Sequence, residues 1–391
     1  GSDPFILPVP GHNLPGVVTF RDLDDVDKML AAADRGGAAV VIGGGLLGLE
    51  AAHGLSLRGM KVTVVHLMPT LMERQLDEAA GYLLKTELER RGQTIVTGGD
   101  TAEILSHDGH VAGVRLKDGR EFAADIVVMA VGIRPASTLA KAAGLEVDRG
   151  IIVDDHMVTS DPAIMAVGEC VQHRGACYGL VAPLWEMCRA LADAACETPS
   201  GYEGSVTSTK LKVSGIDLFS AGDFSGGEGA EDIVMRDAAR GVYKRVVVKD
   251  NRLVGAVLYG DTADGNWYFD LLKKGEDISV IREALIFGQA FASGGALLDP
   301  NAAVAALSDD AEICGCNGVS KARVIETIAS GACSLDAVRS GCKASASCGS
   351  CTGLVESLLT LTLGGEVQSG PKTLCKCTSF SHDDVRRLIL E

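Results

Sequence analysis

Residues 38–66 hold the pattern that most constrains how this chain can fold: a strand, a glycine-rich turn, a helix and a second strand in direct succession. Ala38 to Ile42 is a run of small and β-branched apolar residues, which is typical of a strand buried on both faces of a parallel sheet. Helical apolar periodicity continues from Leu46 to Leu57, and Lys61 to His66 has the composition of a second strand. This order predicts an α/β fold in which helices connect parallel strands.

The turn between the first strand and the helix carries Gly43, Gly45 and Gly48 at the G-x-G-x-x-G spacing. The first glycine allows a tight turn, the second lets the backbone approach a pyrophosphate, and the third lets the helix pack on the strand. The helix N-terminus adds unpaired N–H groups and the positive end of its dipole. Because a strand, a helix and a second strand surround the glycines in the expected order, the pattern predicts a dinucleotide-binding site.

The end of the second strand departs from the usual dinucleotide pattern. An acidic residue there would hold a ribose 2′-hydroxyl, but this chain has His66 instead. Leu67, Met68 and Pro69 follow, so no arginine stands directly after the strand for a 2′-phosphate. We therefore expect His66 to belong to the nucleotide site, and the choice between NADH and NADPH stays open.

The composition is that of a globular protein with about two to four domains over 391 residues. Hydrophobic residues make up 47% of the chain and the mean hydropathy is +0.20, yet no apolar run reaches transmembrane length. The formal net charge of −16 argues against nucleic acid and anionic membranes as partners. Twelve cysteines without a secretory leader predict a reducing, cytoplasmic location, where paired cysteines serve metal or redox chemistry.

Periodicity predicts further elements on both sides of this unit. A short amphipathic helix is expected over Arg21 to Ala33, with an apolar face formed by Leu23, Val26, Met29 and Leu30. Later elements are a helix over Leu76 to Arg91, paired strands around Asp118-Gly119, and a buried strand over Asp125 to Ala130. These segments extend the α/β unit in both directions along the chain.

Two segments resemble the NAD(P)H domain of the flavin-dependent pyridine-nucleotide oxidoreductases. They are Gly43 to Glu50 (GGGLLGLE) and Val128 to Pro135 (VMAVGIRP). The resemblance implies that Glu50 lies near the junction of nicotinamide and flavin, where it is the candidate catalytic residue. It also implies that Gly132 belongs to the cofactor site, and that the cofactors are NAD(P)H and FAD.

A third segment, Thr159 to Glu169 (TSDPAIMAVGE), resembles the second FAD fingerprint of the same family, in which a strand ends in Gly-Asp. The resemblance implies a strand over residues 163–167 and contacts to FAD from Gly168 and Glu169. The family's first FAD fingerprint, another G-x-G-x-x-G, does not precede Gly1. We therefore expect an incomplete FAD-binding domain, with about a hundred residues of the parent protein outside this sequence.

A small α+β domain is expected next. Lys210 to Asp223 and Val242 to Asp261 alternate apolar and polar residues, and Lys249-Asp250-Asn251 between two such runs indicates a hairpin turn. The family has a similar domain at this point, and we expect this one to pack or form an interface without doing chemistry. Ser293 to Asp310, rich in Ala, Gly and Asp, is typical of a linker with one helical turn.

Four cysteines form a second candidate site, in the pattern Cys314-x-Cys316 and Cys348-x-x-Cys351, with 31 residues between the two pairs. Four thiolates on two turns suit an iron–sulfur cluster or a zinc ion, and the ligand types alone do not choose between them. The spacing, with CGCNGV at one end and SCGSCTG at the other, resembles the bacterioferritin-associated ferredoxin-like (BFD-like) module. That resemblance implies that these four cysteines hold a [2Fe–2S] cluster.

Two short helical patterns lie between the cysteine pairs, over Lys321 to Ala329 and Leu335 to Ser340. They indicate a small helical domain that presents the cysteines on the turns at its ends. Cys333 and Cys342 do not fit the pairing, and we expect them to be ordinary core and loop cysteines. A one-electron cluster beside a two-electron flavin domain would give electrons an exit.

The last segment, Thr373 to Glu391, begins like the cluster module again. Cys375-x-Cys377 is followed by an amphipathic helix for which Ser381 is the expected N-cap, with acidic residues in the first turn. No CxxC motif follows before the sequence stops. We expect the sequence to be cut at this end as well, which leaves the role of Cys375 and Cys377 undefined.

The expected fold is α/β, with a Rossmann-like NAD(P)-binding domain inserted in an incomplete FAD-binding domain, then a small α+β domain and a helical BFD-like domain. The expected limits are 1–33 with 136–200 for the partial FAD domain, 34–135 for the NAD(P)H domain, 201–290 for the α+β domain, 291–310 for the linker, 311–365 for the cluster domain, and 371–391 for a truncated following segment.

This domain order resembles the amino-terminal half of the large subunit of assimilatory NAD(P)H-dependent nitrite reductases. The resemblance implies that electrons pass from NAD(P)H through FAD to the [2Fe–2S] cluster. A sirohaem and a [4Fe–4S] cluster, expected only beyond Glu391, would then reduce nitrite to ammonia. The implied partners are NAD(P)H and the nitrite reductase catalytic domain or small subunit, and a homodimer is a further expectation.

Three other functions stay open on the sequence. One is the electron-transfer subunit of an assimilatory nitrate reductase, which shares the modular order. Another is a diaphorase or ferredoxin-type reductase that serves a different acceptor. The third belongs to another class, a non-catalytic zinc- or iron-sensing module that keeps a vestigial nucleotide domain.

Overall fold

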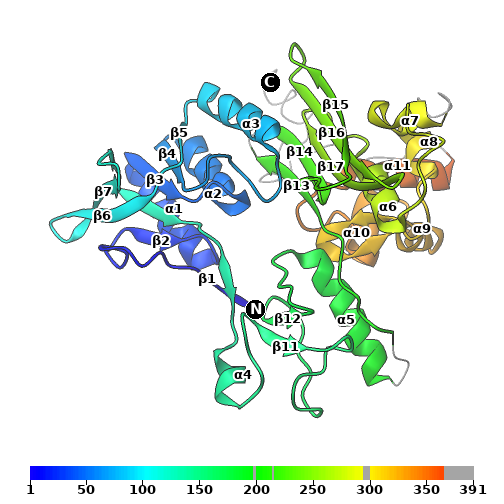
Figure 1. Cartoon of the computed structure of the whole chain (residues 1–391), viewed down its shortest axis with the longest axis horizontal. Helices are drawn as coiled ribbons and strands as arrows, with labels where there is room; N and C mark the ends of the chain where they lie inside the picture. The colour runs from blue at the N-terminus through cyan, green and yellow to red at the C-terminus, as the bar shows by residue number, and fades with distance from the viewer. Residues whose placement is uncertain (197–199, 214, 294–299, 365–391) are drawn as a thin grey trace, which may run out of the picture. The chain divides into compact units, whose positions relative to one another are not determined.

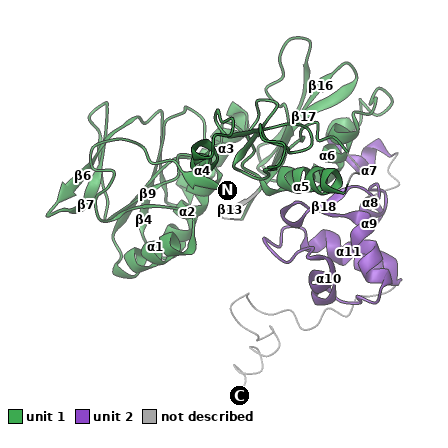
Figure 2. Cartoon of the chain, turned by 90° about the horizontal axis from the view of Figure 1, so that it is seen from below, with its two compact units in different colours: residues 1–286 green, residues 287–391 purple. Residues whose placement is uncertain are grey.

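The computed structural model describes residues 1–196, 200–213, 215–293 and 300–364. The chain divides into two compact units, residues 1–286 and residues 287–391, which Figure 2 distinguishes by colour. The first unit contains the nucleotide domain, the FAD-related segments and the α+β domain. The second contains the four paired cysteines, so the two candidate sites belong to separate units.

The nucleotide domain is built on a five-stranded sheet in which all neighbouring strands are parallel. In spatial order its strands are β2 (Val17–Thr19), β9 (Ile126–Met129), β3 (Ala38–Ile42), β4 (Lys61–His66) and β5 (Thr94–Thr97). Its helices are α1 (Leu23–Arg35), α2 (Leu46–Leu57) and α3 (Glu78–Arg90). The predicted strand–helix–strand over residues 38–66 is confirmed, with the expected ends for all three elements.

The two faces of this sheet are covered differently, which gives three layers (Figure 1). On one face, Val41, Val64 and Val128 pack with the apolar sides of α1, α2 and α3. On the other, Val40 and Val127 pack against a three-stranded antiparallel sheet, β6 (Thr101–His107), β7 (His110–Leu116) and β8 (Glu121–Ala123). Successive strand residues alternate between the two cores, as a strand buried on both sides requires.

The apolar face expected for α1 is only partly right. Met29 is buried, but Leu23 is the first residue of the helix and its side chain is 79% exposed. Asp25 is buried in its place and accepts hydrogen bonds from the Thr19 hydroxyl (2.5 Å) and the Arg21 N–H (3.0 Å). Periodicity treats Asp25 as a surface position because it cannot register these local hydrogen bonds.

The FAD-related segments form short pieces of structure: β1 (Ser2–Pro4) paired with β10 (Ile133–Pro135), β11 (Ile151–Val153) paired with β12 (Val171–His173), and helices α4 (Thr138–Ala142) and α5 (Val181–Ala195). The strand expected over residues 163–167 is wrong. A single bridge between Val158 and Met165 is the pairing found there, and the side chains of that stretch are half-buried or exposed. An apolar run becomes a strand only where a neighbouring strand pairs with it.

The α+β domain has a five-stranded antiparallel sheet in the order β13 (Ser208–Val213), β14 (Ile216–Gly222), β17 (Arg252–Tyr259), β16 (Val242–Lys249) and β15 (Glu231–Asp237), with α6 (Gly265–Lys274) and a 3₁₀ turn at Leu285–Phe287. The predicted hairpin is confirmed, because Asp250 and Asn251 both have positive φ between β16 and β17. Phe219 and Tyr268 pack between the sheet and α6.

The second unit is a small helical domain. It contains α7 (Gln289–Ala292), α8 (Pro300–Ala305), β18 (Glu312–Cys314), a 3₁₀ turn at Gly315–Asn317, β19 (Val319–Ser320), α9 (Lys321–Ala329), α10 (Leu335–Cys342) and α11 (Thr352–Leu363). Val304 and Leu307 lie in its core, so part of the stretch expected as a linker packs inside this unit. The segment over 373–391, with Cys375, Cys377 and Ser381, lies outside the described residues.

No helix in the described ranges combines the length and apolar character needed to cross a bilayer.

Two glycines in α2 offer a matched test of the nucleotide fold. A Cβ at Gly48 would overlap the Gly43 carbonyl oxygen, whereas a Cβ at the exposed Gly54 meets open space. We expect Gly48→Ala to lower the free energy of unfolding by about 1–3 kcal/mol through overpacking. Gly54→Ala should instead raise it by about 0.5–1 kcal/mol, because alanine favours a helix interior. Thermal unfolding followed by circular dichroism measures the change in stability of each variant. Equal changes in the two variants would contradict the close contact between Gly48 and the Gly43 carbonyl.

Candidate nucleotide site and cysteine centre

Two close backbone contacts shape the glycine turn. Gly43 has a φ of +118°, and a Cβ there would overlap the carbonyl of Ala130 in the turn after β9. Gly48 in α2 approaches the Gly43 carbonyl just as closely. Gly45 starts α2 without a side chain to cap it, and nothing lies within 4 Å of where its Cβ would be. The first N–H groups of α2 are therefore available to a phosphate, which fits the predicted use of this turn.

His66 ends β4 and lies against the glycine turn. The Gly44 N–H donates to its Nδ1 over 3.0 Å, and its Nε2 lies 3.0 Å from Oε2 of Glu73. The histidine is 8% exposed; its contact with Gly44 is buried, and its contact with Glu73 is half-buried. Glu73 is a residue that sequence reasoning missed, because it lies in a loop after β4 where no motif spacing marks it.

Glu50 and Gly132 lie on the two chain segments that meet at this turn. Glu50 lies in the second turn of α2; its surface is accessible, but surrounding protein atoms displace part of the water around its carboxyl, and this desolvation raises its pKa above the ordinary value. Gly132 follows β9, has a φ of +111° and accepts a hydrogen bond from the Phe5 N–H (2.9 Å). The Ala130 N–H donates to the Ile42 carbonyl (2.8 Å), which draws the two segments together.

Glu169 is held by two side chains from the start of the sequence. Its Oε2 accepts hydrogen bonds from the Ser2 hydroxyl (2.6 Å) and the Arg21 guanidinium (2.7 Å). Burial opposes the charged form, but these two hydrogen bonds prevail and lower the pKa of the Glu169 carboxyl. Gly168 before it has a φ of +108° and no atom within 4 Å of where its Cβ would be. An ionised, fixed carboxylate beside an open glycine turn fits the FAD contact expected here.

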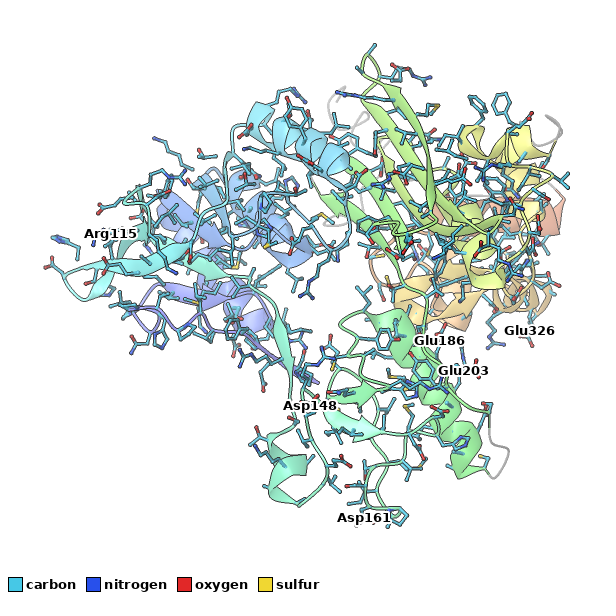
Figure 3. The ribbon with its side chains drawn as sticks, viewed as in Figure 1. Arg115, Asp148, Asp161, Glu186, Glu203 and Glu326 are labelled. Atoms are coloured by element: carbon cyan, nitrogen blue, oxygen red, sulfur yellow. The ribbon has the colours of Figure 1, made fainter. Side chains whose placement is uncertain are left out.

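Glu186 on α5, labelled in Figure 3, connects the FAD-related segments to the α+β domain. It accepts a hydrogen bond from the Ser205 hydroxyl, and its Oε1 lies 3.5 Å from Nζ of Lys273 on α6. The Ser205 hydroxyl also lies 2.7 Å from the hydroxyl of Tyr202. This network ties two parts of the first unit and adds no candidate for chemistry.

The four motif cysteines are brought together as two pairs. The sulfurs of Cys316 and Cys348 are 3.0 Å apart, and Cys314 shares a hydrogen bond with Cys351. That bond to Cys351 lowers the pKa of the Cys314 thiol to about 5, and it raises the pKa of Cys351. Each of two irons in a [2Fe–2S] cluster takes two cysteines, so two sulfur pairs suit that cluster. Among the described residues, no three metal-ligating side chains gather around a single point.

Polar groups on both cysteine loops point at the sulfurs. The Asn317 amide lies 3.7 Å from Sγ of Cys314, and it donates to the Lys343 carbonyl over 2.8 Å. The Ser345 N–H donates to the sulfurs of Cys314 and Cys351. Ser345 is buried and has a φ of +62°, a left-handed conformation that non-glycine residues rarely adopt. Donors of this kind tune the potential of an iron–sulfur cluster.

Two other cysteines lie among the described residues of the second unit, Cys333 and Cys342. Cys333 is exposed, and the Cys342 thiol donates to the Val338 carbonyl within α10. All ten cysteines among the described residues are free thiols.

Three family models match the chain in succession. Residues 1–187 match the model described as pyridine nucleotide-disulphide oxidoreductase. Residues 208–276 match the rubredoxin NAD+ reductase C-terminal domain, and residues 312–360 match the BFD-like [2Fe-2S] binding domain. The expected cofactor set of FAD, NAD(P)H and a [2Fe–2S] cluster agrees with these families.

Solved structures agree on the fold. An FAD-dependent pyridine nucleotide-disulphide oxidoreductase from Desulfovibrio vulgaris is 27% identical, with a TM-score of 0.64 over 75% of this chain and 79% of that one. A ferredoxin reductase from Rhodopseudomonas palustris is also 27% identical, with a TM-score of 0.65 over 71% of this chain and 70% of that one. The chain is thus similar to FAD-dependent pyridine nucleotide-disulphide oxidoreductases over residues 1–187, and to BFD-like [2Fe-2S] binding domains over residues 312–360.

Within that class, its sequence is similar to the amino-terminal half of NAD(P)H nitrite reductases. The nitrite reductase [NAD(P)H] of Bacillus subtilis is 50% identical over 98% of this chain and 48% of the relative. The assimilatory nitrate reductase electron transfer subunit of the same organism is 41% identical over 98% of this chain and 49% of the relative. The large subunit of the Escherichia coli nitrite reductase (NADH) is 34% identical over all of this chain. The chain spans about half the length of these curated relatives.

Asn317 offers a test of how the cysteine loops tune a bound cluster. We expect Asn317→Ala to lower the reduction midpoint potential of the bound cluster. A hydrogen-bond donor near a thiolate stabilises the reduced cluster, which is the more negative state, and the substitution removes that donor. A redox titration followed by visible absorption measures the shift. Ser347→Ala is the matched control, since the Ser347 hydroxyl contacts the Asn317 amide (3.0 Å). If Ser347→Ala lowers the potential equally, the effect belongs to the loop contact and not to the donor at Cys314.

Proposed function

We propose that this chain is the electron-input part of a nitrite reductase. It would take two electrons from NAD(P)H and deliver them one at a time to a nitrite-reducing centre elsewhere in the protein. The observation that carries the proposal is a glycine-rich nucleotide turn and four cysteines brought together as two pairs on one chain. When bound, FAD accepts a hydride and releases single electrons, and a [2Fe–2S] cluster carries one electron at a time.

At the nucleotide end, the proposed work of the chain is binding and orientation. The uncapped start of α2 at Gly45 would hold the pyrophosphate, while the close contact between Gly43 and Gly48 keeps side chains out of its way. Glu50, with its raised pKa, would lie at the nicotinamide and hold or release a proton there. Gly132 would line the same site from the turn after β9.

At the flavin end, Gly168 and Glu169 would contact FAD, with Ser2 and Arg21 holding the carboxylate in place. We assign residues 1–33 and 136–200 to the FAD-related part and residues 34–135 to the NAD(P)H domain. Residues 201–290 would serve packing. Residues 291–310 would connect this domain to the cluster domain at 311–365, and Val304 and Leu307 of this connection pack in the core of the second unit.

At the exit, Cys314, Cys316, Cys348 and Cys351 would ligate the iron, two to each metal ion. The amide of Asn317 and the N–H of Ser345 would stabilise the charge that builds up on the sulfurs. We further propose that the acceptor is a sirohaem and [4Fe–4S] domain or small subunit that reduces nitrite to ammonia. We also propose a cytoplasmic location, where paired cysteines serve metal or redox chemistry. The homodimer stays a prediction.

The first test is the visible spectrum and metal content of the purified chain. We expect about two irons per chain and the absorption of an oxidised [2Fe–2S] centre, which anaerobic NADH should bleach where FAD is bound. Ser substitutions at Cys314, Cys316, Cys348 or Cys351 should each remove that absorption and the iron. Cys333→Ser is the control and should retain both. A colourless chain that contains one zinc ion would contradict the proposed electron-input function and favour a non-catalytic metal-binding module.

The electron-transfer subunit of an assimilatory nitrate reductase is the second candidate, favoured by the 41% identity to such a subunit over 98% of this chain. The two candidates differ in the terminal acceptor. We expect NADH oxidation by the complete protein to require nitrite and to yield ammonium, measured by nucleotide absorbance and ammonium assay. Oxidation that requires nitrate and yields nitrite would overturn this and establish the alternative.

A further inference from the structure

The nucleotide site contains a buried histidine at the position where dinucleotide domains usually have an acid. A backbone N–H can only donate, so the Gly44 N–H makes Nδ1 of His66 an acceptor. We therefore assign the proton to Nε2, which donates it to Oε2 of Glu73. Both ring nitrogens of His66 are used in this way, and the ring is buried. His66 thus holds other groups in place, and a ribose hydroxyl would find its acceptor on Glu73.

The loop after β4 is fixed to the glycine turn by a second contact. The Met72 N–H donates to the Gly44 carbonyl over 3.0 Å, so the N–H of Gly44 is bound to His66 and its carbonyl to Met72. Met72 is buried and has a φ of +52°, a left-handed conformation that is uncommon for a residue with a side chain. Such strain persists where the surroundings enforce it, and it is concentrated at functional sites. Here it turns the chain so that Glu73 faces His66.

We propose that Glu73, positioned by His66, replaces the missing acid and makes this site selective for NADH over NADPH. This inference rests on the proposed nucleotide site. The Glu73 side chain is 32% exposed, so its carboxylate is open to a ligand while its inner oxygen is held by His66. It would accept hydrogen bonds from the hydroxyls of the adenosine ribose. A 2′-phosphate at the same place would meet a like charge, which disfavours NADPH.

The surrounding residues agree with this choice. Leu67, Met68 and Pro69 after β4 carry no charge that could neutralise a 2′-phosphate. Arg74 is exposed and adjacent in sequence to Glu73, so it is the cation that could reverse the preference. The selectivity therefore depends on which of these neighbouring side chains meets the ribose, and the contact between Glu73 and His66 favours the carboxylate.

The test measures binding of ADP-ribose and of 2′-phospho-ADP-ribose to the whole chain by isothermal titration calorimetry. Neither probe carries nicotinamide, so the comparison isolates the adenosine ribose. We expect the wild-type chain to bind ADP-ribose more tightly by about tenfold or more, the order of effect for a hydrogen bond to a charged group. Glu73→Gln should bring the ratio of the two affinities close to one.

Two further variants separate position from charge. In His66→Asn, the amide oxygen of the new side chain can accept the hydrogen bond from the Gly44 N–H, but the side chain is too short to reach Glu73. The affinity ratio of ADP-ribose to 2′-phospho-ADP-ribose should therefore fall, although the glycine turn is kept. Arg74→Ala is the matched control, and it should leave the preference for ADP-ribose in place. Thermal unfolding of each variant, compared with the wild type, shows that the nucleotide domain is still folded.

The possible failures are distinct. If both probes bind but Glu73→Gln leaves their ratio unchanged, the role of Glu73 is wrong while the nucleotide site stands. If the wild-type chain prefers 2′-phospho-ADP-ribose and Arg74→Ala abolishes that preference, Arg74 and not Glu73 determines the nucleotide. If neither probe binds the wild-type chain, the proposed nucleotide site and the inference that rests on it both fall.

Discussion

The nucleotide domain depends on the contact between α2 and the glycine turn at its own beginning. Side chains are excluded from Gly48 by the Gly43 carbonyl, and from Gly43 by the carbonyl of Ala130 after β9. Three chain segments therefore meet backbone to backbone, with the uncapped start of α2 at their junction. His66 and the loop after β4 are attached to this turn through Gly44. The Gly44 N–H donates to His66, and its carbonyl accepts from the Met72 N–H.

The carboxylate of Asp77 helps to connect this domain to the α+β sheet. Asp77 caps α3 by accepting the Ala80 N–H (3.0 Å) through one oxygen. Its other oxygen accepts hydrogen bonds from the Tyr243 hydroxyl (2.5 Å) and the Arg245 guanidinium (3.1 Å), both on β16. Burial, followed by the contact with Asp77, raises the pKa of Tyr243 to beyond its ordinary range. The apolar side of the sheet around Tyr243 belongs to the same core as α3, which makes the first unit one compact body.

The cysteine centre has a different physical basis, because its two loops have few apolar residues of their own. Ser320 and Ser334 cap α9 and α10, and these helices pack with α11 to form the core beneath the loops. Asn317 then joins one loop to the other through the Lys343 carbonyl. The sulfurs of Cys316 and Cys348 thereby come within 3.0 Å although 31 residues separate the two motifs.

The sequence alone determined the elements whose signals are local. The periodicity of the side chains predicts the strand–helix–strand over residues 38–66 with the ends that the structure has. The turn residues predict the hairpin at Asp250 at the right place. Tertiary structure decided what depends on distant partners. The stretch over 163–167 is apolar but has little to pair with, so it is not a strand. Ser2 reaches Glu169 across 167 positions, and Glu73 reaches His66 from a loop without a motif. Hydrogen bonds between side chains leave no periodic trace in a sequence, because their geometry exists only once the backbone has brought the partners together.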